Sequence, residues 1–167
     1  MSILSRRNAF LLTALLLMSC GGEAARKRAE KLDETVNALR KIESAVQVGV
    51  NNQQYTSLVV EAKAKVDLAN DLLPNGEFKT RLNSALDCYL DAGKAWAEKL
   101  DQWELLDVKD PVGKALIEKY SLQSANKDFL DEGRFYTRTG VPFDTALQTM
   151  WEMGRRNLSA LIKLNEH

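Results

Sequence analysis

The chain has 167 residues, and its 23 Lys and Arg residues balance its 23 Asp and Glu residues, so the formal net charge is zero. This balance argues against an obligate nucleic-acid binder, which normally carries a basic excess. Hydrophobic residues make up 45% of the chain and charged residues 28%, with only 9 Gly and 3 Pro. That composition excludes the disordered and collagen-like classes, and at this length we expect one folded domain.

The first twenty residues carry the most specific pattern in the sequence. Arg6 and Arg7 form a short basic region, and the apolar run AFLLTALLLM follows at residues 9–18. A helix that spans a bilayer needs about 20 apolar residues, whereas a basic region followed by a shorter apolar stretch is typical of a secretory signal peptide. We therefore expect export, by the general secretory route or by the twin-arginine route.

The apolar run ends in the segment Leu17-Met18-Ser19-Cys20-Gly21. This segment resembles the lipobox of bacterial lipoproteins. The resemblance implies that diacylglycerol is attached to the sulfur of Cys20 and that the chain is cut just before this residue. Two acyl chains, at about 0.8 kcal/mol per buried methylene, are enough for stable anchoring. The alternative is an ordinary secretory signal in which Cys20 is incidental.

The resemblance also gives the domain organisation and the location. A signal peptide would occupy residues 1–19, a lipidated tether residues 20–22, and a helical domain residues 23–167. The mature chain would be held by its lipid on the extracytoplasmic side of a bacterial membrane. Gly21, in place of an aspartate after the cysteine, favours the outer membrane in a host that has one.

The apolar residues of the body recur every three or four positions, which predicts helices. Glu43 is the single misfit on the first of these apolar stripes. Short turns between long helices predict antiparallel neighbours. The stripes cover residues 25–50, 55–73, 78–103 and 147–162.

The segment between the third and the last stripe is less regular. Residues 112–120 and 126–137 each fit a short helix, the first with Asp110 as N-cap and Pro111 at its first position. We find no alternating run of β-branched residues in the chain. The sequence therefore predicts an all-α fold, an antiparallel bundle of about four long helices with a short-helix insertion.

An aromatic column on the third helix is the candidate ligand site. Leu82, Tyr89, Trp96 and Trp103 stand seven residues apart, so they share one face of the helix. Aromatic walls with a few polar groups are how small-molecule sites are built, and Trp151 of the last helix is a possible further member. Packing in the core is the favoured alternative, because large residues at heptad spacing fill the interior of a bundle.

The residue inventory gives no catalytic group or cofactor site. The one histidine is His167 at the end of the sequence, so Ser-His-Asp, HExxH and Glu-x-x-His arrangements cannot be built from these residues. Cys88 is the only cysteine besides Cys20, too few for a thiolate zinc site. We expect no cofactor and no metal, and we expect Cys88 to be a small buried hydrophobic residue.

Two further kinds of cluster permit weaker hypotheses. Paired carboxylates are what a glycosidase needs, although exposed helix ends explain such clusters better. Interleaved basic and aromatic residues suit a polyanion or glycan, although amphipathic surfaces also carry them. The acidic clusters are Glu104, Asp107 and Asp110, and Asp128, Asp131 and Glu132. The basic and aromatic residues are Arg134, Phe135, Tyr136 and Arg138, with Arg155 and Arg156 further along.

These patterns together favour a non-enzymatic, membrane-anchored helical lipoprotein that contacts a protein partner in the cell envelope. The alternative function is a small-molecule or lipid-binding lipoprotein with an aromatic-lined pocket. Its possible ligand-binding residues are Tyr89, Trp96, Trp103 and Trp151. No nucleic-acid partner is expected.

Overall fold

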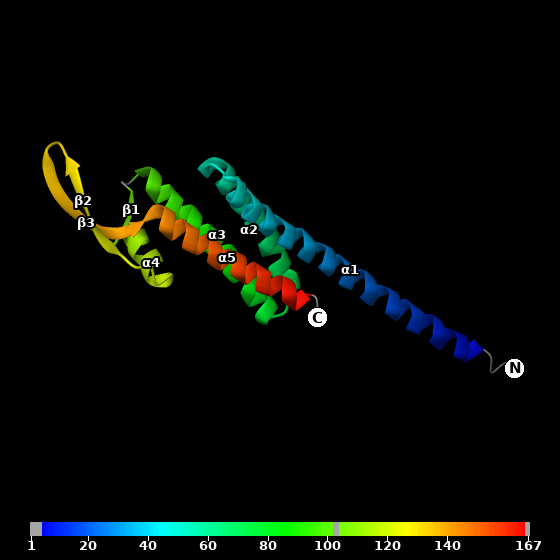
Figure 1. Ribbon diagram of the computed structural model, residues 1–167. Coiled ribbons are helices and arrows are strands. Elements are labelled where there is room, and N and C mark those ends of the chain that lie inside the picture. The colour runs from blue at the N-terminus through cyan, green and yellow to red at the C-terminus, as the bar shows by residue number, and fades with distance from the viewer. Residues whose placement is uncertain (1–4, 102–103, 166–167) are drawn as a thin grey trace.

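The computed structural model describes residues 5–101 and 104–165 and is mainly helical (Figure 1). Four long helices make up most of it: α1 (Ser5–Val48), α2 (Asn52–Leu72), α3 (Glu77–Asp101) and α5 (Phe143–Asn165). A short helix, α4 (Pro111–Lys119), and three strands, β1 (Leu105–Asp107), β2 (Ala125–Asp131) and β3 (Arg134–Pro142), lie between α3 and α5 in the sequence.

Helix α1 extends well past the other helices at its N-terminal end (Figure 1). Residues 22–30 are exposed on every side, and Thr35 is the first residue of α1 that the structure shows as buried. At 1.5 Å per residue, residues 22–34 therefore make up about 20 Å of helix directly before the packed part of α1. Within the described residues, no helix combines the length and apolar character that crossing a membrane requires.

The turn between α1 and α2 is defined by local signals. Gly49 has a φ of 90°, in the left-handed region that favours glycine. Asn51 is the N-cap of α2, and its side chain accepts a hydrogen bond from the backbone N–H of Gln54 at 2.9 Å. The Gln54 side chain in turn accepts from the N–H of Asn51, which completes a capping box. The turn makes α2 antiparallel to α1 (Figure 1).

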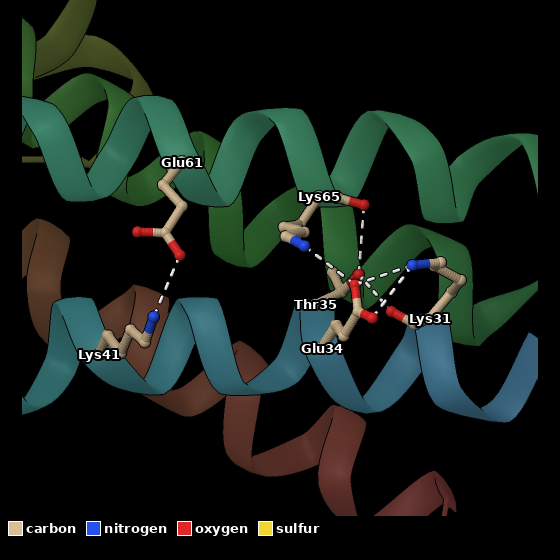
Figure 2. Close-up of polar contacts among 6 residues, drawn as sticks. All are labelled: Lys31, Glu34, Thr35, Lys41, Glu61 and Lys65. Atoms are coloured by element: carbon tan, nitrogen blue, oxygen red, sulfur yellow. Dashed lines mark hydrogen bonds and ion pairs between the residues drawn. The ribbon is translucent and has the colours of Figure 1, made fainter.

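Polar contacts fix how α1 and α2 lie against each other (Figure 2). The carboxylate of Glu34 accepts from Lys31 at 3.0 Å on its own helix and from Lys65 of α2 at 2.9 Å. The hydroxyl of Thr35, which is buried, donates to the carbonyl oxygen of Lys31 at 2.7 Å and lies 3.2 Å from the carbonyl oxygen of Lys65. These contacts lock the two helices at one register.

The core lies between the four long helices, and α3 packs along α5 over most of its length (Figure 1). Gly154 of α5 allows this close approach, because a Cβ atom there would lie only 2.9 Å from the ring of Tyr89. The largest fully buried side chains come from all four long helices and from β1 and β3. They are Tyr55, Tyr89, Phe143, Leu39, Ile42, Leu82, Leu106, Met150, Leu158, Leu161, Val66 and Val141.

A three-stranded antiparallel sheet in the order β1-β3-β2 lies at the end of the molecule farthest from the N-terminus of α1 (Figure 1). Leu106 of β1 pairs with Val141 of β3, and Phe129 of β2 pairs with Tyr136 of β3. Gly140 permits the close pairing of β1 with β3, since a Cβ atom there would lie 2.4 Å from the carbonyl oxygen of Leu106. The chain passes from β3 directly into α5.

The expectation of a mainly helical chain is confirmed, and so is the short helix near residues 112–120, which is α4 with Asp110 as its N-cap. The all-α prediction is wrong for the sheet, and residues 126–137 form a β-hairpin in place of the expected short helix. Glu132 and Gly133 cause the difference, because both take positive φ angles, 48° and 78°. Two adjacent residues of that kind form the tight reversal of a hairpin and end any helix.

Candidate functional site

Three aromatic side chains from three helices meet inside the molecule. The ring centroids of Tyr55 and Trp96 are 5.4 Å apart, those of Trp96 and Trp151 5.7 Å, and those of Tyr55 and Trp151 6.0 Å. The indole N–H of Trp151 donates to the Tyr55 hydroxyl at 3.1 Å, and that hydroxyl donates to the carbonyl oxygen of Tyr89 at 2.8 Å. The three rings therefore pack on one another and fill the space between α2, α3 and α5.

The predicted ligand-binding residues are partly brought together. Trp96 and Trp151 are in ring contact and are half-buried, and Tyr89 is buried on the same helix as Trp96. Trp103 lies outside the described residues. Tyr55 was missed as a site residue, although it opens the apolar stripe of the second helix, because spacing along one helix does not show which rings meet across helices.

A cavity of about 210 Å³ lies beside this aromatic cluster, between α1, α3 and α5. Tyr89 and Trp151 line one part of it, and Glu43 and Arg155 bring opposite charges to it. The hydroxyl of Tyr89 is buried and has no hydrogen-bond partner within the part of the chain that the structure describes. Burial raises the pKa of this hydroxyl far above its ordinary value, so it stays protonated as a donor.

The β2–β3 hairpin is the second candidate site. On one face, Phe129 of β2 stacks on Tyr136 of β3 with ring centroids 5.6 Å apart. The ammonium group of Lys127 lies 5.5 Å from the Phe129 ring, and the guanidinium group of Arg138 lies 5.7 Å from the Tyr136 ring. Lys127 also forms an ion pair with Glu104. This face therefore carries two rings, each with a cation beside it.

The other face of the hairpin ends in an exposed apolar pair. Leu130 and Phe135 face each other across the two strands next to the turn, and they are 62% and 81% exposed. Strand alternation thus separates Phe135 from Tyr136 and Arg138, which the sequence had grouped with it. Arg155 and Arg156, in the second half of α5, lie about 18 Å along that helix from its junction with β3 and do not belong to this surface.

The predicted acidic clusters serve local structure where their contacts are described. The carboxylate of Asp107 accepts from the backbone N–H of Lys109 at 2.8 Å, and that of Asp110 accepts from the N–H of Gly113 at 2.8 Å as the N-cap of α4. Asp128 accepts from the hydroxyl of Thr137 at 2.6 Å across the hairpin. Glu132 takes part in the turn. The side chain of Asp131 lies outside the described part.

A buried carboxylate holds α4 against α3. Asp91 is 4% exposed and accepts hydrogen bonds from Lys119 at 2.6 Å, Lys94 at 2.8 Å and the Tyr120 hydroxyl at 3.0 Å. Burial alone would raise the pKa of this carboxyl, but the three donors outweigh it and hold the pKa below its usual value. Nearby Cys88 is buried as expected, and burial raises the pKa of its thiol, which makes a reactive thiolate unfavourable.

The proposed lipid attachment site, Cys20, falls within the backbone of α1, but its side chain lies outside the described part of the chain. His167 is outside it as well. Within the described residues, no three His, Cys, Asp or Glu side chains are grouped as metal ligands.

Comparison of the chain with models of protein families, with curated proteins and with solved structures finds no match.

Proposed function

We propose that this chain is a lipid-anchored, non-enzymatic module of the bacterial cell envelope that contacts a protein partner through the β2–β3 hairpin. The observation that carries the proposal is the exposed pair Leu130 and Phe135 at the far tip of the hairpin. Burying a Leu or Phe side chain contributes about 1.5–3 kcal/mol relative to leaving it exposed. A partner that covers both side chains would gain a binding free energy of this size from each of them.

The arrangement of the molecule suits this role. The N-terminal end of α1, where the lipobox-like segment lies, and the hairpin are at opposite ends (Figure 1). A lipid on Cys20 would hold one end at the membrane, and the exposed polar turns at residues 22–30 would separate the helices from the bilayer. The hairpin would then face away from the membrane that holds the chain.

The four long helices are the scaffold in this proposal. We propose that α1, α2, α3 and α5 act as one antiparallel four-helix bundle, with α3 and α5 as its most extensive helix pair. In an outer-membrane lipoprotein of this kind, the bundle sets the distance between the lipid and the hairpin. Its stability does not depend on what the tip contacts.

The side chains of the hairpin also indicate the chemistry of the partner. By strand register, Lys127, Arg134 and Arg138 share one face with the stacked rings, and Asp131 lies on the same face opposite Arg134. Lys127 is paired with Glu104, so this face keeps a small net positive charge. The apolar tip needs a hydrophobic depression on the partner, and the basic face favours acidic groups around it. We therefore propose a protein with an apolar pocket that acidic residues surround.

The anchor is tested by Cys20→Ser with radiolabelled fatty acid in growing cells. The parent chain is expected to take up label and to run at the size of the processed form. The Cys20→Ser chain is expected to take up none and to accumulate as precursor. Equal labelling of both chains would refute lipidation at Cys20.

The contact surface is tested by a photoactivatable phenylalanine analogue in place of Phe135 in the full chain, irradiated in cells. We expect one discrete crosslinked product, which Leu130→Ser in the same chain removes. The matched control places the analogue at Val60, an equally apolar side chain exposed on α2 at 63%, and is expected to give no such product. The same product from both positions, or none from position 135, would refute the hairpin as the contact surface.

A further inference from the structure

The cavity between α1, α3 and α5 has the size and chemistry of a small-molecule site that is independent of the hairpin. Its volume is about 210 Å³, below the roughly 300–1,000 Å³ of sites for drug-sized ligands. Its lining is mixed in character, with the indole of Trp151 and the side chain of Val46 beside charged and amide groups. An occupant must therefore be small and must carry polar groups.

Tyr89 supplies a hydrogen-bond donor that lacks an acceptor. Its side chain is 1% exposed, and its hydroxyl has no partner among the described residues. A buried polar group without a partner costs about 1–3 kcal/mol. The ring packs closely against Gly154, where an added Cβ atom would lie only 2.9 Å from it. The hydroxyl oxygen is closed to a water-sized molecule, so a ligand group in the cavity that Tyr89 lines accepts from it, and removes the cost, after a small shift of the cavity wall.

Glu43, which is half-buried, and Arg155, which is exposed, carry opposite charges and form no ion pair with each other. Both line the cavity, and both act on the Tyr89 hydroxyl electrostatically, in opposite directions. Neither forms an ion pair or hydrogen bond with any residue in the described part of the chain. By contrast, Glu152 in the same lining accepts from Gln148 at 3.0 Å. Glu43 is also the charged residue that interrupts the apolar stripe of α1.

We propose that this cavity binds a small zwitterion of the amino-acid class. The ammonium group pairs with Glu43, the carboxylate pairs with Arg155 and accepts from the Tyr89 hydroxyl, and a small apolar side group lies against Val46 and Trp151. A ligand with both charges satisfies all three groups at once, whereas a ligand with one charge leaves a carboxylate or a guanidinium unmatched. The cavity would therefore discriminate against ligands with one charge, because their binding leaves Glu43 or Arg155 without a partner.

The test is isothermal titration calorimetry of the full chain in detergent with the twenty standard amino acids at millimolar concentration. For each amino acid that binds, the matched probes are its decarboxylated amine and its deaminated acid. L-valine, for example, is compared with isobutylamine and 3-methylbutanoate. We expect at least one small apolar amino acid to bind. Each single-charge analogue should bind with an affinity at least about tenfold lower, since one charge-assisted hydrogen bond is lost.

Variants separate the cavity from the rest of the protein. Glu43→Gln and Arg155→Gln are each expected to weaken binding about tenfold or more, and Tyr89→Phe by a smaller factor. The matched control is Lys163→Gln, which removes an exposed cation of the same helix that does not line this cavity, and it should bind as the parent does. Thermal unfolding without ligand checks that each variant folds.

Three results would overturn the proposal. They are no heat of binding from any of the twenty amino acids, equal affinity for an amino acid and its single-charge analogues, and unchanged affinity in both Glu43→Gln and Arg155→Gln. Water alone in the cavity would give the first of these. None of them bears on crosslinking at Phe135, so the hairpin proposal stands or falls separately.

Discussion

The helical body and the β2–β3 hairpin differ in how their large apolar side chains are placed and in what stabilises each region. In the body, side chains such as Leu39, Leu82 and Leu161 are fully buried between helices. In the hairpin, Leu130 and Phe135 are exposed, and the contacts that hold the strands together are cross-strand pairs, such as Phe129 on Tyr136. The body is therefore stabilised by a shared core, and the hairpin by local pairing on a rigid base.

This difference shows at which positions a residue can be suited to binding a partner without being constrained by packing in the core. The choice of residue in the core is constrained by packing, because interiors are close-packed and a change of one methylene group alters the stability of the fold. A residue at the hairpin tip contributes little to folding, so its chemistry can match something outside the chain. Large apolar residues at such a position are the feature that we interpret as a contact surface.

The largest expected difference comes from one substitution made in both regions. Leu39→Ala removes a side chain that is 0% exposed and should lower the free energy of unfolding by about 2–5 kcal/mol. Leu130→Ala, at the hairpin tip, should change it by no more than about 0.5 kcal/mol. Urea unfolding followed by circular dichroism measures both. A loss at Leu130 as large as that at Leu39 would mean that the hairpin belongs to the core.

The junction of the two regions is expected to be the next most sensitive place. Gly140→Ala would put a Cβ atom 2.4 Å from the carbonyl oxygen of Leu106, where backbone must shift, and should cost about 3 kcal/mol. Gly76→Ala is the matched control, because a Cβ atom there meets nothing within 4 Å. Similar unfolding midpoints for the two variants would contradict the close pairing of β1 with β3.

Acid sensitivity should arise in the body, at the Asp91 contacts that hold α4. The pKa of this carboxyl is lowered in the folded chain, so its contribution is present above the unfolded pKa of about 3.9 and is lost as the pH falls through the folded value. Asp91→Asn should cost about 2 kcal/mol at neutral pH, since it replaces hydrogen bonds to a charged group, and should flatten the loss of stability below about pH 4.

Denaturation of parent and Asp91→Asn at a series of pH values measures this effect. Asp128→Asn in the hairpin is the control, because its carboxylate is exposed and bonded to Thr137 alone among the described side chains. A parent curve with the same acid slope as the Asp91→Asn curve would contradict the role of Asp91.

The turn before α2 should show the smallest effect on the body. Asn51→Ala removes the side-chain acceptor of the Gln54 N–H, which is one half of the capping box, and should cost about 1 kcal/mol. Thermal unfolding of parent and variant gives the value. No change would mean that the α1–α2 contacts around Glu34 and Thr35 hold the start of α2 without its cap.

Much of the body could be predicted from the sequence, because its signals are local or periodic. Apolar residues three and four apart gave the long helices, and Asp110 with Pro111 gave the start of α4. The hairpin was missed because its strands are exposed, so no buried face imposes the alternating pattern. The remaining signal, Glu132-Gly133 between stretches with Phe, Tyr and Thr, resembles the Asp-Gly turns of hairpins and was interpreted as helix.

The candidate sites were only half visible for a related reason. Tyr89 and Trp151 could be selected by residue type and spacing, but their contact with Tyr55 depends on how three helices pack. Glu43 was visible as a misfit, and its place beside the cavity with Arg155 was not, because the two residues are far apart in the sequence. The face of the hairpin on which each side chain lies depends on the strand register, which the sequence did not show either.

The most direct test of the hairpin as a contact surface is cysteine labelling. Phe135→Cys and Val60→Cys are each treated with N-ethylmaleimide, both as purified protein and in isolated cell envelopes. Cys88 is buried and contributes little labelling.

We predict that both cysteines react readily in the purified protein. In envelopes, the labelling rate at position 135 should fall at least about tenfold, because a partner buries it. The labelling rate at position 60 should be unchanged. Labelling of position 135 that is as fast in envelopes as in the purified protein would contradict the account.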